Sequence, residues 1–309
     1  PNPYKGLRAF KEADAKEFFG RDELIERLLK RMDETVAFSR FLALVGPSGS
    51  GKSSVINAGI LPALRNGAIQ NSDNWFYIEM FPGNNPFEEL EAALLRIAVN
   101  PPSNILANLL SDTDGLARVV EQLLPPNNDI ELLLVIDQFE EVFTQLDDDA
   151  LRDQFLLSIQ TAMEQLQSRL RIIITLRADF YDRPLYFPTF AEMFRQRTEV
   201  ILPMSREELH QSIVSPAEQV DVALESGLAP TILRDIAEQP GALPLLQYAL
   251  TELFDRREGR ILTHKAYRDS GGVLGALAWR ADEIYNHLTR TQQAAAKQSF
   301  FKNRIEAKH

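Results

Sequence analysis

The chain has 309 residues, which is enough for about two domains at roughly 150 residues per domain. Its 45% hydrophobic and 25% charged residues are typical of a folded globular protein and exclude extended disorder. The 44 acidic and 33 basic residues give a net charge of −11, which disfavours binding to nucleic acid or to an anionic membrane through a broad basic face.

Residue usage also limits the metal chemistry and the compartment. Cysteine is absent, which excludes disulfides and thiolate sites and is typical of the reducing cytoplasm, where we expect the protein. The four histidines are too scattered for a zinc site on one segment, and the longest apolar runs are strand-length, so we expect no membrane span. With neither an initiator methionine nor a signal peptide, we expect the chain to belong to a longer polypeptide.

Five short apolar runs alternate with helical patterns through the first two thirds of the sequence. Near-continuous apolar strands are buried on both faces, so this order predicts an α/β fold in which a parallel sheet lies between two layers of helices. The predicted strands cover residues 41–45, 75–80, 132–137, 171–176 and 199–202.

Helix signals fill the remaining segments, and the chain after the fifth strand is predicted to be helical. Asn85 and Pro86 have the residue types of an N-cap and a first helical position, and Ser205 with Glu208 forms a capping box. The predicted helices cover residues 88–98, 116–124, 205–213, 243–257 and 273–288. The predicted domains are an α/β domain over residues 1–203, a helical lid domain over 204–288 and an incomplete C-terminal segment over 289–309.

The segment from Gly46 to Ser53 matches the phosphate-loop motif G-x-x-x-x-G-K-[ST] in full. A predicted strand precedes it and a helical stretch follows, a context that disfavours a Gly/Ser turn matching by chance. Glycines let consecutive N–H groups point at phosphate oxygens, Lys52 would reach the β- and γ-phosphates, and Ser53 would bind Mg²⁺. The residues expected to bind the nucleotide phosphates are Gly46, Ser48, Gly49, Ser50, Gly51, Lys52, Ser53 and Ser54.

A second motif is the apolar run over residues 132–136 that ends at Asp137. In P-loop NTPases a carboxylate at this place orients Mg²⁺, so Asp137 and Ser53 are the predicted metal-binding residues. Glu140 and Glu141 follow within one turn, where a carboxylate can act as the general base towards the attacking water. Spacing does not rank the two glutamates, and a solvent-exposed first helical turn is the alternative for both.

The third motif is the strand over residues 171–176 with Arg177 after it. If this strand lies next to the strand of Asp137, Arg177 would present a cation near the γ-phosphate and is a candidate catalytic residue. The alternative is a surface arginine outside the site.

With these motifs in order, the chain resembles the STAND NTPases, signal-transduction ATPases related to the AAA+ class, and in particular the bacterial novel STAND subgroup. The stretches IDQFEEVF around Asp137 and TLRADFYDR around Arg177 match the extended Walker B motif and the sensor strand of that family. The segment FGRDE over residues 19–23 is similar to a family motif that lies against base and ribose, which implies nucleotide contacts from Gly20 and Arg21.

A further match is the segment PGALPLL over residues 240–246, which resembles a family segment whose proline packs near the adenine. The resemblance implies this contact for Pro244, although Ala242 stands where the family has glycine, which leaves Gly241 without an assigned role. The resemblance extends to about Leu288. Family members continue into a winged-helix domain, for which the residues after Leu288 leave too little room, and residues 300–304 are a candidate stub of its first helix.

The resemblance implies ATP or ADP with Mg²⁺ as ligands, effector and sensor domains covalently linked outside this chain, and self-association of the ATP-bound form. The guanine signature N-K-x-D is absent, which favours ATP over GTP. Arg195 and Arg197 stand where AAA+ rings carry an arginine finger, but a basic helix end that complements the helix dipole is the favoured alternative. We therefore expect slow or partner-dependent hydrolysis.

These observations favour an ATP/ADP-operated switch in a signalling protein. Two alternatives stay open. One is a constitutive AAA+-type ATPase that remodels a client and uses an arginine finger from a neighbouring copy. The other is an interaction scaffold that keeps its nucleotide without hydrolysing it.

Overall fold

The computed structural model describes residues 2–98, 102–127, 129–165, 168–237, 241, 243–273, 275, 278, 285, 286, 288, 289, 292 and 293. The chain forms two compact units. We call Ala9–Glu208 the sheet unit, and Pro1–Arg8 together with Leu209–His309 the helical unit. This division differs from a boundary at residue 203, because the segment before Ala9 groups with the helical unit and residues 204–208 group with the sheet unit.

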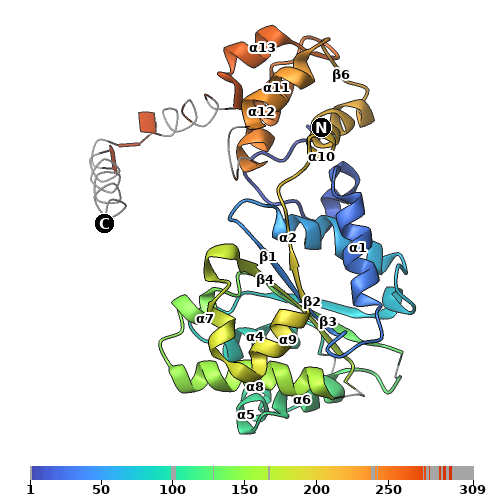
Figure 1. The fold of residues 1–309 in the computed structure, drawn as a ribbon, viewed down its shortest axis with the longest axis vertical. Coiled ribbons are helices and arrows are strands. Elements are labelled where there is room, and N and C mark those ends of the chain that lie inside the picture. The colour runs from blue at the N-terminus through green and yellow to red at the C-terminus, as the bar shows by residue number, and fades with distance from the viewer. Residues whose placement is uncertain are drawn as a thin grey trace. The chain divides into compact units, whose positions relative to one another are not determined.

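A parallel five-stranded sheet with the order β2-β3-β4-β1-β5 forms the centre of the sheet unit (Figure 1). Since β4 lies between β1 and β3, and Gly46 pairs with Arg177, the ends of these three strands meet at one edge. The strands are β1 (Phe41–Gly46), β2 (Phe76–Met80), β3 (Leu132–Ile136), β4 (Leu170–Arg177) and β5 (Thr198–Val200). The predicted α/β fold is confirmed, and each predicted strand overlaps an observed one.

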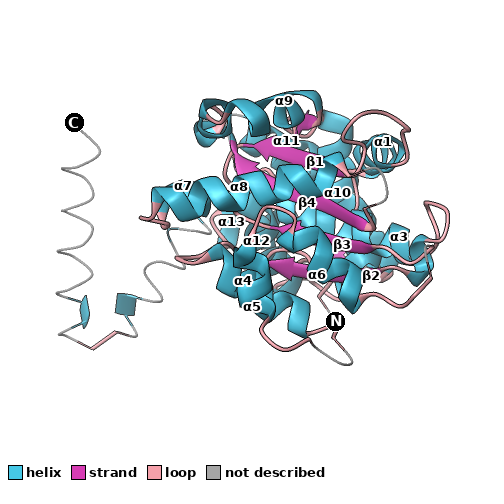
Figure 2. Cartoon of the chain, turned by 90° about the horizontal axis from the view of Figure 1, so that it is seen from below, coloured by secondary structure: helices cyan, strands magenta, loops and turns pink. Residues whose placement is uncertain are grey.

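Alternate residues of the strands face two separate cores. On β1, Phe41, Ala43 and Val45 belong to the core shared with α4, α5, α6, α8 and α9, whereas Leu42 and Leu44 belong to the core shared with α1 and the helix after β1. Figure 2 looks onto the face of the sheet that α6 and α8 cover. The near-continuous apolar sequence of the strands is therefore explained by helices on both faces of the sheet.

The helices of the sheet unit are α1 (Asp22–Met32), α2 (Lys52–Ser54), α3 (Leu61–Arg65), α4 (Pro86–Leu95), α5 (Ile105–Ser111), α6 (Gly115–Leu123), α7 (Glu141–Thr144), α8 (Asp149–Glu164) and α9 (Pro188–Gln196). The predicted start of α4 is confirmed, because the Asn85 side chain accepts from the Glu88 N–H and Pro86 follows the cap.

The helix after β1 consists of α2, a π-helical turn over Val55–Ile60 and α3. Pro62 has no N–H to donate to the carbonyl four residues before it, which accounts for the irregular winding. A Cβ on Gly59 in this turn would lie 2.5 Å from Ile25 Cδ1, so the glycine lets α1 pack closely against the helix.

The helical unit contains α10 (Arg206–Gln219), α11 (Leu228–Ala237), α12 (Leu243–Asp255) and α13 (His264–Asp269), with α10 beginning in the sheet unit. The expectation of helices alone is wrong at β6 (Ala223–Leu224) and β7 (Ile261–Leu262), a parallel pair too short to leave a periodic pattern. The expected end of α10 near Ile213 is also wrong, because the helix continues through Pro216, which is buried with Ala217.

The N-terminal segment is held to the helical unit by its own side chains. The buried Tyr4 donates its hydroxyl to the Ile213 carbonyl, and the Asn2 amide donates to the Thr251 carbonyl at 3.1 Å. Most of the helix predicted over residues 273–288, and residues 294–309 with the segment 300–304, lie outside the described residues. Within the described part of the chain, no helix combines the length and the apolar character that a bilayer span requires.

Candidate functional site

The phosphate-loop sequence forms a turn between β1 and α2 whose backbone needs its glycines. Gly49 and Gly51 adopt φ of +74° and +89°, and a Cβ on Gly51 would touch nothing, so conformation alone selects glycine there. A Cβ on Gly46 would instead lie 2.8 Å from Ser50 Oγ, so that glycine serves close packing. Gly51 is the N-cap of α2, which directs the positive end of the helix at the loop.

Lys52 is the cation of this loop. Its Nζ donates to the carbonyl oxygens of Gly46 at 2.9 Å and Pro47 at 3.0 Å. Burial lowers the pKa of Lys52, and the charges of Glu140 and Asp137 oppose that shift. The ammonium therefore lies within the electrostatic reach of Asp137 and Glu140, two of the three predicted acidic site residues.

The serines of the loop differ in their surroundings. Ser50 is buried, and its Oγ has no hydrogen-bond partner among the described residues. Ser48 is exposed, and Ser54 Oγ accepts from the Phe10 N–H at 3.3 Å. A buried hydroxyl without a partner suits a loop built to meet an external polar group, because such a group is otherwise costly to bury.

Asp137 lies at the end of β3 and is 5% exposed. Its Oδ1 accepts hydrogen bonds from Ser53 Oγ at 3.0 Å, from the N–H of the next residue, Gln138, at 3.1 Å, and from Thr175 Oγ1. The chain places the hydroxyl and the carboxylate predicted to bind Mg²⁺ in direct contact. Oxygen donors of this kind fit Mg²⁺, which proteins typically hold through one or two such groups and substrate phosphates.

Glu140 and Glu141 point to different neighbours. Glu140 is 9% exposed, and its Oε2 accepts from the Arg177 N–H at 3.3 Å. Burial raises the pKa of Glu140, while the hydrogen bonds to its carboxylate and the charges of Lys52 and Arg177 act against the shift. Glu141 Oε2 accepts from the Gly83 N–H at 3.0 Å, so it anchors the loop after β2. Of the two, Glu140 is the residue that lies in the field of Lys52.

Arg177 lies at the predicted edge of the sheet, but its side chain is 43% exposed and pairs with Asp179 at 2.6 Å. This hydrogen-bonded pair raises the pKa of Arg177. Its backbone N–H donates to Glu140, so Arg177 reaches the acidic group through the main chain.

Sequence reasoning missed two contacts around Asp137. Thr175 Oγ1 donates to Asp137 and accepts from the Gln138 N–H at 2.9 Å, so it fixes the carboxylate and the turn after it, in which Gln138 has a φ of +56°. On the neighbouring strand β2, Glu79 Oε1 accepts from Asn57 Nδ2 at 3.3 Å, and burial raises the pKa of Glu79. A threonine two residues before Arg177 was the sequence signal for the first contact; the second left no motif.

Arg21 contacts the phosphate loop, the segment just after β5 and the start of α10, and its implied contact with base and ribose stays a prediction. Its side chain is 5% exposed, and Nη2 donates to the carbonyls of Leu202 at 3.1 Å and Ser50 at 3.4 Å. Its Nη1 lies 3.6 Å from Glu208 Oε1. Gly20 packs beside it, since a Cβ there would lie 2.3 Å from the Glu208 carbonyl oxygen.

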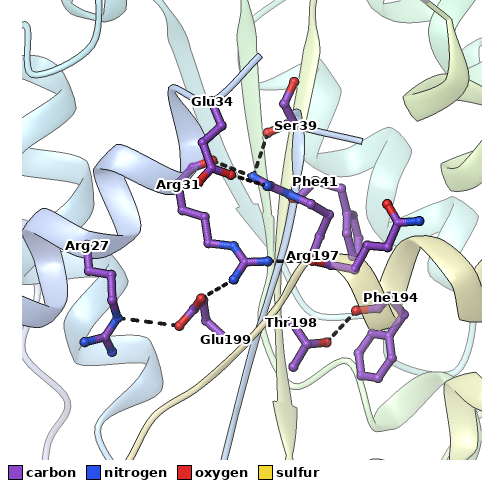
Figure 3. A network of polar contacts seen from close by, with 10 residues as sticks. Arg27, Arg31, Glu34, Ser39, Phe41, Phe194, Arg197, Thr198 and Glu199 are labelled. Atoms are coloured by element: carbon purple, nitrogen blue, oxygen red, sulfur yellow. Dashed lines mark hydrogen bonds and ion pairs between the residues drawn. The ribbon is translucent and has the colours of Figure 1, made fainter. Parts of the chain in front are cut away.

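The two arginine-finger candidates, Arg195 and Arg197, occupy opposite environments. Figure 3 shows Arg197 among its polar partners. Arg197 is 2% exposed and donates to the carbonyls of Arg31, Phe41 and Ser39 and to Glu34. Arg195 is 65% exposed, and its ion-pair partner among the described residues is Glu192 of its own helix at 2.9 Å. Because it is buried among acceptors of its own chain, we interpret Arg197 as a structural residue. The sequence favoured a basic helix end over an arginine finger at this position. Arg197 contacts several segments rather than a helix end alone.

The family model of the novel STAND NTPases named Novel STAND NTPase 1 (nSTAND1) matches residues 3–304. The chain belongs to this family. The predicted resemblance to the novel STAND NTPases is thereby confirmed.

Solved structures similar to this nSTAND1 chain include AAA+-type proteins. Cdc6p from Pyrobaculum aerophilum has a TM-score of 0.51 and 17% identity, over 82% of this chain and 63% of that chain. The Aeropyrum pernix ORC2 protein in ADPNP–ADP complexes has a TM-score of 0.52 and 17% identity, over 82% of this chain and 67% of that chain. At such identities the likeness shows the fold alone, and this chain spans less than two thirds of Cdc6p. No curated protein matches it.

Two features of the nSTAND1 chain complete the site description. Pro244 lies in the first turn of α12 in the helical unit, and its predicted contact with adenine stays a prediction; Pro240 and Ala242 lie outside the described residues.

Within the described ranges there is no cluster of three or more His, Asp or Glu side chains suited to a metal ion. The hydrogen-bonded oxygen donors Ser53 and Asp137 remain the residues that would hold Mg²⁺, an ion that proteins usually bind together with phosphate and water.

Proposed function

We propose that this chain is the nucleotide-operated switch of a larger cytoplasmic signalling protein. In this proposal it binds ADP or ATP with Mg²⁺ at the phosphate loop, hydrolyses ATP slowly or with a partner's help, and self-associates when ATP is bound. Effector and sensor domains linked outside this chain belong to the same proposal, and the net charge of −11 favours neither nucleic acid nor membrane as a partner. The observation that carries the proposal is the hydrogen-bonded set of Ser53, Asp137 and Thr175 beside Lys52.

In this proposal the residues of the site have separate roles in binding phosphate, binding Mg²⁺ and accepting the proton of the attacking water. Lys52 and the N–H groups of the loop hold the phosphates, and Ser53 and Asp137 hold Mg²⁺. When bound, Mg²⁺ neutralises charge on the phosphate oxygens during phosphoryl transfer. Glu140 acts as the general base rather than Glu141, because it is buried near Lys52 and its raised pKa makes it a better proton acceptor, whereas Glu141 is bonded to Gly83.

Base preference and turnover are further parts of the proposal. The missing N-K-x-D signature favours ATP over GTP, and Pro244 packs near the adenine by analogy with the family. Arg177 reaches the γ-phosphate only after its ion pair with Asp179 breaks. Breaking this pair costs little free energy because both side chains are exposed. Arg197 is held by its own chain and supplies no finger, which favours slow intrinsic hydrolysis.

Calorimetry with ADP and with ATP·Mg²⁺ tests the switch. Nucleotide can shift an equilibrium between two forms only by its difference in affinity for them, and a tenfold difference corresponds to about 1.4 kcal/mol. We expect ATP·Mg²⁺ to favour the self-associated form and ADP the monomer. Equal affinities of both nucleotides for both forms would rule out a nucleotide-operated switch and leave the scaffold that keeps its nucleotide.

One observation favours a second function, a constitutive ATPase that remodels a client. Arg195 is exposed and lies just before β5, so it is free to reach a site on a neighbouring copy. The ATPase rate measured against protein concentration separates the two functions. A steep rise that Arg195→Ala abolishes would support the remodeller, whereas a low rate at all concentrations supports the switch.

A further inference from the structure

The contacts of Arg21 connect three segments of the sheet unit that are far apart in sequence. The guanidinium donates through Nη2 to the Ser50 carbonyl inside the phosphate loop and to the Leu202 carbonyl just after β5, and it pairs through Nη1 with Glu208 in the first turn of α10. Arg21 is 5% exposed, and its bond to Ser50 is buried, whereas Glu208 is 28% exposed. An arginine suits this task because its planar head carries several donors in fixed directions.

The bond to Ser50 bears on the shape of the phosphate loop. In a trans peptide the C=O and N–H point in opposite directions, so holding the Ser50 carbonyl also orients the N–H of the next residue, Gly51. No cis peptide occurs among the residues that the structure describes, and Gly51 adopts a φ of +89° at this place. Arg21 therefore fixes the peptide between Ser50 and Gly51 so that its N–H points away from the guanidinium.

The other end of the contact is the start of α10. Glu208 and Ser205 form the capping box of this helix, with Glu208 N–H to Ser205 Oγ at 3.1 Å and Ser205 N–H to Glu208 Oε2 at 2.6 Å. The same carboxylate faces Arg21. Gly20, with a φ of +82°, leaves room for the Glu208 carbonyl, where any Cβ would clash. The motif Gly20-Arg21 thus contacts the first turn of α10 and the phosphate loop.

We propose that Arg21 is a positioning residue that holds the phosphate loop in its binding shape and couples it to the first turn of α10. This inference rests on the proposed nucleotide binding and assigns Arg21 to the phosphates rather than to the base. Because α10 continues from the sheet unit into the helical unit after Glu208, its first turn is the segment through which phosphate binding reaches the rest of the helix.

The test compares ATP·Mg²⁺ with inorganic tripolyphosphate and Mg²⁺, which has no base, by calorimetry on the full chain. Arg21→Met keeps most of the side-chain volume but removes the donors. We expect this variant to lower the binding affinity for both ligands by the same factor, about 10- to 100-fold, which corresponds to the loss of one charged hydrogen bond. Arg27→Met is the matched control in α1, the helix whose N-cap is Arg21. Arg27 is 54% exposed and, among the described residues, pairs with Glu199, so both affinities should be unchanged.

A contact between Arg21 and the base predicts a different result. In that case Arg21→Met would weaken ATP and leave tripolyphosphate binding as in the unchanged chain, which would overturn the proposal. If the unchanged chain binds neither ligand, the nucleotide-binding function itself fails, so the two failures are distinguishable.

Glu208→Gln provides a second variant in case Arg21→Met does not fold, since glutamine can keep the capping box while losing the charge that faces Arg21. We expect a smaller loss, again equal for both ligands. Hydrogen exchange gives a readout that a merely structural role would not move. Tripolyphosphate should protect the amides of residues 205–208 in the unchanged chain and leave them unaffected in Glu208→Gln; equal protection in both would overturn the coupling.

Discussion

Arg197 and Arg195 form a natural matched pair, two residues apart, for testing which arginine is structural. Arg197→Met removes a buried guanidinium and leaves the carbonyls of Arg31 and Phe41 without their donor. The same change at Arg195 removes an exposed side chain whose ion partner is Glu192 on the same helix. The structural account predicts a large loss of stability for the first variant and almost none for the second.

The size of the effect follows from the contacts of Arg197. Hydrogen bonds from a charged donor contribute about 1.5–3 kcal/mol each, so the two carbonyl bonds give roughly 3–6 kcal/mol. The bond to Ser39 at 3.5 Å is too long to count, and Glu34 is 42% exposed, so this pair adds at most about 1 kcal/mol. The total is then roughly 3–7 kcal/mol. For a unit of this size each kcal/mol shifts Tm by about 2–4 °C, which predicts a fall of about 6–28 °C.

Thermal unfolding and ATPase rates on the two variants check this prediction together. We expect Arg197→Met to lower Tm strongly, and Arg195→Met to leave it unchanged, because exposed ion pairs often contribute nothing measurable. If Arg197→Met kept the Tm of the unchanged chain and lost hydrolysis, Arg197 would be a catalytic finger and the structural reasoning would be wrong.

Further predictions concern the acidic edge of the sheet. Glu140→Gln should lower the hydrolysis rate by about 10²- to 10⁴-fold, as expected for a lost general base, whereas Glu141→Gln should change it only slightly; the reverse order in a steady-state ATPase assay would exchange their roles. Burial raises the folded-state pKa of Glu140 above 4.5, so its ionised form destabilises the fold at neutral pH and this cost disappears as the pH falls below the unfolded-state value. Glu140→Gln should therefore raise Tm at about pH 7 and bring no gain near about pH 4, and a gain of the same size at both values would contradict the burial argument. Thr175→Val keeps the shape of the side chain but removes the hydrogen-bond donor to Asp137. We therefore expect about a tenfold loss of the Mg²⁺-dependent part of the ATP affinity and little change in ATP binding without Mg²⁺. An equal loss with and without Mg²⁺ would show that Thr175 does not act through Asp137.

The strands could be predicted from the sequence, and the directions of side chains at the strand ends could not. The apolar run that predicted a strand over residues 132–137 corresponds to β3 at Leu132–Ile136, because burial on both faces leaves a continuous pattern. Glu140 and Glu141 were indistinguishable by spacing. Their carboxylates accept from different N–H groups, those of Arg177 and Gly83, after a turn at Gln138. That turn is held by Thr175 of the neighbouring strand β4, which is far away in sequence.

The same limit explains the arginines. Arg195 and Arg197 have the same residue type at one helix end, and only the packing of α1 and β1 shows that Arg197 is enclosed. Ser53 and Asp137 lie in hydrogen-bond contact, since both follow strands whose carboxyl ends share an edge, and their binding of Mg²⁺ stays a prediction. The acceptors of Arg21 lie about 29 and 181 residues away in the chain, a separation at which no local pattern reports a contact.

The most direct test of nucleotide binding at the phosphate loop is calorimetric titration of ATP·Mg²⁺ into the unchanged chain and into Lys52→Ala. Lys30→Ala is the control, because Lys30 is an exposed lysine on α1. The account predicts binding by the unchanged chain and by Lys30→Ala, and none by Lys52→Ala, since Lys52 is the cation of the loop. Binding of undiminished affinity by Lys52→Ala would contradict the assignment of the phosphate site.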